Sequence, residues 1–135
     1  MINDFQSRKE VWIALSDLFL DTDVTIFYDH IVNMCAKSNY TIEEMKEILV
    51  HEVGPALAFN LHDIAGEWSG FDEYWLINRI VTIRSRKQNF IIRILYFGSE
   101  MAVRRYAIYH WNIISKFIIE KRRSAQQSDA SETMT

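Results

Sequence analysis

Apolar residues along most of this chain recur at steps of three and four, a spacing that places them on one face of an α-helix. A first stretch, from Gln6 to Leu20, has the clearest pattern, in Val11, Trp12, Leu15, Leu18 and Phe19. A second stretch, from Val24 to Lys37, repeats it. Because each such helix must bury its apolar stripe against another element, the spacing predicts an all-α fold.

Capping signals divide this pattern into separate helices. The strongest is Thr41-Ile42-Glu43-Glu44, a capping box that predicts the start of a helix reaching about Glu52. Gly54-Pro55 interrupts the pattern, and since proline is tolerated in a first turn, a short helix is expected from there to Gly66. Further helices are expected over about 72–83, 90–97 and 99–123, with a break at Gly98.

The segment 77–97 permits a second interpretation. Its runs 77–83 and 90–97 are rich in isoleucine and aromatic residues and flank a polar gap, which is also typical of a β-hairpin. Both runs are nearly continuously apolar rather than alternating, so we favour two helices and keep the hairpin as the alternative. The sequence thus predicts a single-domain bundle of about five to seven helices over residues 1–123, and a disordered polar tail over 124–135.

Composition restricts the class of protein further. Four glycines and one proline in 135 residues argue against turn-dense all-β architectures. The single cysteine, Cys35, excludes an internal disulfide. No apolar run reaches the roughly 20 residues of a membrane span, and the first ten residues do not resemble a signal peptide. We therefore expect a small cytoplasmic protein with no membrane association.

Charge is distributed unevenly along the chain. Residues 1–70 contain twelve acidic and four basic residues, a net charge of −8, whereas residues 71–135 contain six acidic and eleven basic residues, a net charge of +5. If the early acids share a face, that face attracts a basic partner and repels nucleic acid. The plainer interpretation is that the two halves pack together and neutralise each other.

Three carboxylates suggest an enzymatic alternative. Asp63 and Glu67 lie four residues apart, hence on one face of a helix, and Glu52 precedes them. Paired carboxylates carry acid–base chemistry when they share a pocket, so a small hydrolytic enzyme is one alternative function. Solvated carboxylates, or carboxylates that cap backbone amides, are the plainer interpretation.

Motifs for metal or nucleophilic chemistry are incomplete. His51-Glu52 begins the HExxH zinc motif, but Pro55 occupies the position of its second histidine. Cys35 lies on the apolar stripe of the expected helix from Val24 to Lys37, without the electropositive setting that activates a thiol. We expect no metal, no cofactor and no catalytic residue.

Basic residues of the second half alternate with aromatic residues in a manner typical of nucleic-acid binding: Arg79, Arg84, Arg86, Lys87, Arg93, Arg104 and Arg105, with Tyr96, Tyr106, Tyr109 and Trp111. The overall sequence pI of about 5.8 disfavours nucleic acid, because phosphate binding needs net attraction. A nucleic-acid or regulatory adaptor is therefore the second alternative function.

Two stretches resemble a family of small bacterial proteins catalogued as a domain of unknown function. The first is VWIALSDLFLDT at 11–22; the second comprises EVGPAL at 52–57, NL at 60–61, AGEWSGFD at 65–72 and WL at 75–76. The resemblance spans about Arg8 to Ile80. It implies a small, mostly helical protein without established chemistry, so no catalytic residue carries over.

In size, expected location and acidic first half, the chain also resembles in type the immunity proteins of contact-dependent growth inhibition and related toxin–immunity systems. Such proteins block a delivered toxin, often a basic nuclease, and a negative face speeds that association. We therefore expect a non-enzymatic immunity protein that binds a cognate toxin domain, in an oligomeric state the sequence leaves open. Its expected binding residues are acidic: Asp21, Asp23, Glu43, Glu44, Glu47, Glu52, Asp63 and Glu67.

Overall fold

The computed structural model of the chain describes residues 4–20, 22–57, 72–85 and 90–133, and every regular element there is helical. The all-α prediction is confirmed, and 77–85 and 90–97 are helical rather than strands of a hairpin. The elements in order are α1 (Asp4–Ser16), η1 (Asp17–Phe19), η2 (Val24–Phe27), α2 (Tyr28–Lys37), α3 (Ile42–Ile48), η3 (Leu49–Val53), α4 (Gly54–Leu57), α5 (Glu73–Ser85) and α6 (Phe90–Thr133).

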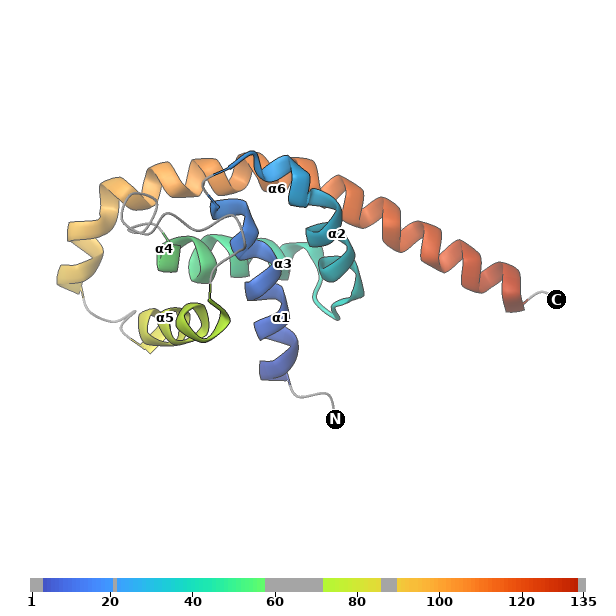
Figure 1. Cartoon of the computed structure of the whole chain (residues 1–135), viewed down its shortest axis with the longest axis horizontal. Helices are drawn as coiled ribbons and strands as arrows, with labels where there is room; N and C mark the ends of the chain where they lie inside the picture. Colours follow the sequence, from blue (N-terminus) through green and yellow to red (C-terminus); the bar gives the residue numbers. More distant parts are fainter. Residues whose placement is uncertain (1–3, 21, 58–71, 86–89, 134–135) are drawn as a thin grey trace.

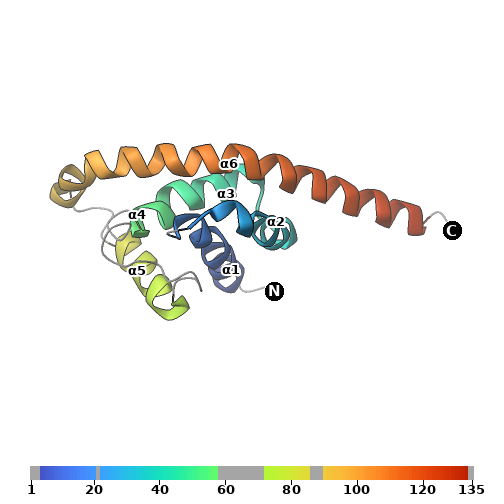
Figure 2. The same cartoon turned by 45° about the horizontal axis from the view of Figure 1, so that its top comes forward.

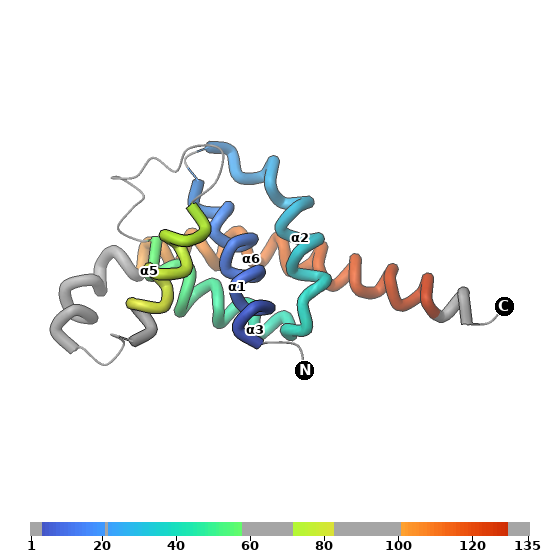
Figure 3. Tube along the Cα trace, turned by 60° about the horizontal axis from the view of Figure 1, so that its bottom comes forward, coloured from blue at the N-terminus to red at the C-terminus, as the bar shows by residue number. Residues whose placement is uncertain are grey.

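The long helix α6 runs along one edge of the molecule, and the other helices lie together on one side of α6 (Figures 1 and 2). Helix α2 lies against α6, α1 packs on α2 and η3, and α4 contacts both α5 and α6. The last part of α6 extends beyond α2, away from the rest of the fold (Figure 3). The molecule is thus a compact helical body fastened to one long helix.

The core lies between this body and α6. Trp12 and Leu15 of α1 are completely buried, as is Ile31 of α2. Helix α6 faces them with a stripe at steps of three and four: Val103, Ala107, Trp111, Ile114 and Ile118. Met101 and Phe117 lie off the angular position of this buried stripe and are 46% and 49% exposed.

Helix α6 is longer than predicted at both ends. It passes through Gly98, where a break was expected, because one glycine costs a helix only about 1 kcal/mol. It also continues past Arg123 to Thr133 in place of the expected disordered tail. The chain has neither glycine nor proline after Gly98, so no residue there stops a helix that the packed region has already nucleated.

The predicted break at Gly54-Pro55 is instead a change of helix type. Helix α3 passes into the π-helix η3, which passes directly into α4. The N–H of Gly54 donates to the carbonyl of Leu49, five residues back. A proline in a regular α-helix clashes with the carbonyl four residues before it, here that of His51. The wider π turn just before Pro55 accommodates the ring, so the helical run continues.

Candidate functional site

Helix α3 brings three of the predicted acidic residues together. Its capping box is present: the Glu44 N–H donates to Thr41 Oγ1 at 3.1 Å, and the Thr41 N–H donates to Glu44 Oε1 at 3.2 Å. Glu43, Glu44 and Glu47 are all exposed. Glu44 helps to start the helix. Glu43 and Glu47, which lie one turn apart, take no part in the capping box.

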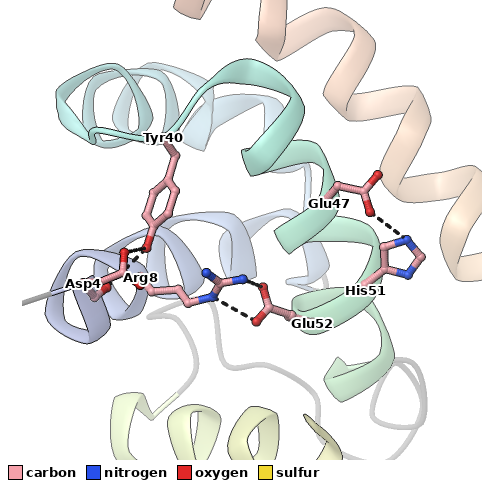
Figure 4. Close-up of polar contacts among 6 residues, drawn as sticks. All are labelled: Asp4, Arg8, Tyr40, Glu47, His51 and Glu52. Carbon is pink, nitrogen blue, oxygen red and sulfur yellow. Dashed lines mark hydrogen bonds and ion pairs between the residues drawn. The ribbon is translucent and has the colours of Figure 1, made fainter. Parts of the chain in front are cut away.

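Glu47 has a nearby histidine on the same helical run. His51 Nε2 lies 3.0 Å from Glu47 Oε2, and the two side chains are 40% and 67% exposed (Figure 4). A pair so exposed contributes little to stability. Glu47 therefore remains accessible to a partner, and its charge is offset only when His51 is protonated.

Glu52 differs from the acids of α3, because it points into the molecule. It is 4% exposed, and its Oε1 and Oε2 accept hydrogen bonds from Arg8 Nε and Nη2 at 3.0 and 2.8 Å (Figure 4). The expectation that Glu52 belongs to an exposed binding surface is wrong. Burial of a carboxylate requires a paired cation, and α1 supplies one.

Arg8 lies within a set of polar contacts that fastens the start of α1. Its guanidinium carbon lies 5.8 Å from the centre of the Tyr40 ring, and the Tyr40 hydroxyl donates to Asp4, with Asp4 Oδ1 at 2.8 Å (Figure 4). The hydrogen bond to Glu52 raises the pKa of Arg8 above its usual value. These contacts join α1 to η3 and to the loop before α3.

The remaining predicted acids lie elsewhere. Asp23 is exposed and precedes η2, where its Oδ1 accepts hydrogen bonds from Thr25 Oγ1 at 2.7 Å and Thr25 N–H at 3.1 Å. These bonds lower the pKa of Asp23 below its usual value. Asp21, Asp63 and Glu67 lie outside the described residues. Of the three carboxylates on which the hydrolytic alternative depends, the structure therefore describes only Glu52.

The ion pairs that the structure describes, Arg8–Glu52 and Glu47–His51, both join residues within 1–70. On α6, Arg104, Arg105, Lys116 and Arg123 are exposed. None of the described ion pairs therefore joins an acid of the first half to a base of α6.

Arg122 has a role that sequence analysis missed. Basic residues in a helix commonly interact with the carbonyls at the end of that same helix. Instead, the Arg122 guanidinium donates to carbonyls at the end of α2 and in the following loop, at 2.8 to 3.3 Å: Cys35, Ala36, Ser38 and Tyr40. No local pattern pairs a residue with carbonyls more than eighty positions away.

A group of aromatic residues fastens the other end of α2 to α6. The Tyr28 hydroxyl hydrogen-bonds to His110 Nδ1, and the Tyr106 hydroxyl donates to the Leu18 carbonyl at 2.5 Å. Burial lowers the pKa of His110 and raises the pKa values of Tyr28 and Tyr106. Burial thus favours the neutral form of all three groups, which suits a structural junction.

Other chemical candidates fit structural roles. Burial raises the pKa of Cys35 to about 12, so its thiol stays protonated and poorly nucleophilic. Among the described residues, no three histidine, cysteine or acidic side chains are grouped so that they could hold a metal ion. None of the described helices combines the length and apolar character required to cross a bilayer.

The protein is a small all-α domain, and most of the partly buried polar contacts described above hold one helix against another. The chain belongs to the family described as Domain of unknown function (DUF7079), which matches residues 6–117. The family resemblance expected from the sequence is confirmed and extends well past Ile80 into α6. Searches of curated proteins and of solved structures found no match.

Proposed function

We propose that this protein is a non-enzymatic immunity protein that binds and neutralises a cognate bacterial toxin domain, with a basic nuclease as the expected toxin class. One observation carries the proposal. The acids of α3 are exposed, and none of the described ion pairs joins them to the basic residues of the second half. An exposed acidic surface accelerates association with a cationic protein.

The structure of α3 suits a binding surface. The capping box fixes the start of the helix, and Met45 and Ile48 on its inner face are fully buried. Glu43 and Glu47 therefore project from a backbone that is already ordered. A preorganised surface loses less conformational entropy on binding than a mobile one.

The contacts of Glu52 favour this proposal over the hydrolytic alternative. Both oxygens of the carboxylate accept hydrogen bonds from Arg8, and the side chain is buried between α1 and η3. Glu52 thus connects two helices. A general base instead needs an oxygen positioned against a substrate proton.

A charge reversal at Glu43→Lys/Glu47→Lys tests the proposal. Glu44 is left intact, because its replacement would also remove the helix cap. The matched control is Glu10→Lys/Asp29→Lys, which changes the net charge equally at exposed sites of α1 and α2. The toxin candidate is the product of the gene directly upstream, because an immunity gene normally follows its toxin gene.

Growth of bacteria that express this candidate toxin is the readout. The natural chain and the control should restore growth, and the purified proteins should bind the candidate one to one. The α3 variant should restore growth poorly and associate more slowly. Equal protection by the α3 variant would exclude this surface, and failure of the natural chain to bind or protect would overturn the proposal.

A further inference from the structure

Two separate sets of hydrogen bonds join α2 to α6, and they lie at opposite ends of α2. At the end of α2 and in the loop after it, the Arg122 guanidinium donates to four carbonyls of residues 35–40. At the start of α2, the Tyr28 hydroxyl hydrogen-bonds to His110 Nδ1. The two sets differ in their response to pH, because arginine stays charged at every accessible pH whereas histidine titrates close to neutrality.

His110 is enclosed by aromatic rings at the start of α2. It is 8% exposed, and its ring lies against those of Tyr28, Tyr106 and Tyr109, with ring centres 4.6 to 5.8 Å from its own. The Tyr106 hydroxyl donates in turn to the Leu18 carbonyl of η1. The histidine therefore lies where η1, α2 and α6 meet, along the contact between α2 and α6 (Figure 1).

No described carboxylate near this junction is placed to balance a charge on His110. The charged residues beside the junction on η1, η2, α2 and α6 are Asp17, Asp23, Asp29, His30 and Arg105. All of them except the half-buried Asp17 are exposed. The charges of Asp17 and Asp23 interact with His30 and Tyr28, respectively. Burial, rather than a charged neighbour, lowers the pKa of His110, so a proton on its ring would be a buried and unbalanced charge.

We propose that His110 makes the attachment of α2 to α6 sensitive to acid, so that the start of α2 separates from α6 when the histidine takes up a proton. While His110 is neutral, it shares a hydrogen bond with the Tyr28 hydroxyl inside closely packed rings. A protonated imidazole has two donors and no acceptor, and its charge is better hydrated outside the rings than enclosed by them. Arg122 keeps the end of α2 attached, so α2 opens from one end only.

The direction of the pH effect follows from the lowered pKa of His110. A histidine whose pKa is lower in the packed state than in the open state binds its proton preferentially in the open state. The attachment is therefore strongest well above pH 6.5, the ordinary pKa of histidine, and weakens as the pH falls through that value. This proposal uses no residue of the α3 surface, so its failure and that of the toxin-binding proposal are separable.

Hydrogen exchange of the full natural chain, followed by mass spectrometry at about pH 7.5 and about pH 5.5, tests the inference. After correction for the intrinsic effect of pH on exchange, the protection of residues 24–31 should fall at the lower pH by up to about tenfold. That is the factor by which protonation of an ordinary histidine favours the open state over this range. The protection of α1, and of residues 35–40 beside Arg122, should change by less than about twofold.

His110→Gln, which keeps a polar group beside the Tyr28 hydroxyl, should show equal protection of residues 24–31 at the two pH values. The matched control is His30→Gln, which removes an exposed histidine of α2 and should keep the acid response of the natural chain. Survival of that response in His110→Gln, or its loss in His30→Gln, would overturn the proposal.

The natural chain decides the question even if His110→Gln does not fold. An equal loss of protection in α1, α2 and α3 at the lower pH would show that acid unfolds the whole domain rather than this junction. Unchanged or higher protection of residues 24–31 at the lower pH would show that the aromatic rings accommodate the protonated histidine. Either result would contradict the proposed opening of α2.

Discussion

Glu47 and Glu52 lie five residues apart on one helical run, yet they occupy opposite environments. The Glu47 side chain is 67% exposed beside a histidine, whereas that of Glu52 is 5% exposed and is held by both guanidinium contacts of Arg8. The π turn of η3 begins between them and alters the direction in which later side chains project. Identical residues on one run thus serve as a surface charge and as an internal connection.

Removal of one partner of the internal pair should have the largest effect. Arg8→Met removes the guanidinium that donates to both oxygens of the buried Glu52 carboxylate, which should lower the free energy of unfolding by about 3 kcal/mol. Urea denaturation followed by circular dichroism measures the loss. Glu47→Gln, the exposed counterpart, should change stability by less than about 0.5 kcal/mol.

The double variant Arg8→Met/Glu52→Leu distinguishes pairing from packing. Removal of both charges should recover much of the stability lost in Arg8→Met, because the buried carboxylate is removed together with its cation. If the double variant lost as much stability as Arg8→Met and Glu52→Leu lose together, Arg8 would contribute mainly through packing of its stem.

Arg122 extends the comparison to α6, because its neighbour Arg123 is exposed. Arg122→Met leaves several carbonyls of the α2 end without their charged donor and should cost about 2 kcal/mol. Arg123→Met should be within about 0.5 kcal/mol of the natural chain. Thermal unfolding compares the stability of the two variants. Similar melting temperatures would contradict the role of Arg122 in holding α6 to the end of α2.

Gly54→Ala probes the π turn that separates the two environments. An ideal Cβ at Gly54 lies 3.0 Å from the Leu49 carbonyl oxygen and 3.5 Å from Val103 Cγ1. Crowding of the backbone oxygen should destabilise the protein by about 1 kcal/mol. Chemical denaturation measures the change in the free energy of unfolding. Its sign tests the crowding at Gly54, because glycine-to-alanine changes at unstrained helix positions stabilise by roughly 0.5–1 kcal/mol.

The smallest expected difference in stability is between alanine variants of the neighbouring acids Glu44 and Glu43. Glu44→Ala removes half of the capping box and should cost about 0.5 kcal/mol. Glu43→Ala should cost less, since no described contact of the Glu43 side chain supports the fold. Equal losses in a urea titration would indicate that the cap adds nothing measurable.

The helical fold follows from local sequence, because its signals are local. The capping box at Thr41 is found where the sequence places it, and the apolar steps of α1 mark buried residues such as Trp12 and Leu15. Helix ends were less predictable. Gly98 and Pro55 are both helix-breaking signals, but one glycine costs a helix only about 1 kcal/mol, and a π turn accommodates the proline.

The environment of each candidate site residue was not predictable in the same way. Whether Glu52 is buried depends on Arg8, forty-four residues away, and Arg122 meets carbonyls more than eighty residues distant. Such pairs are set by how helices pack. The sequence showed which residues carry charge but not which of them the fold uses internally.

The association rate of the chain with the product of the upstream gene, measured by stopped-flow fluorescence over a series of salt concentrations, tests the toxin-binding proposal most directly. For the natural chain, the rate should fall steeply as salt screens the charges of α3. For Glu43→Lys/Glu47→Lys, it should be slower at low salt and vary little. Identical rates and salt dependence for the two proteins would contradict a binding role for the α3 acids.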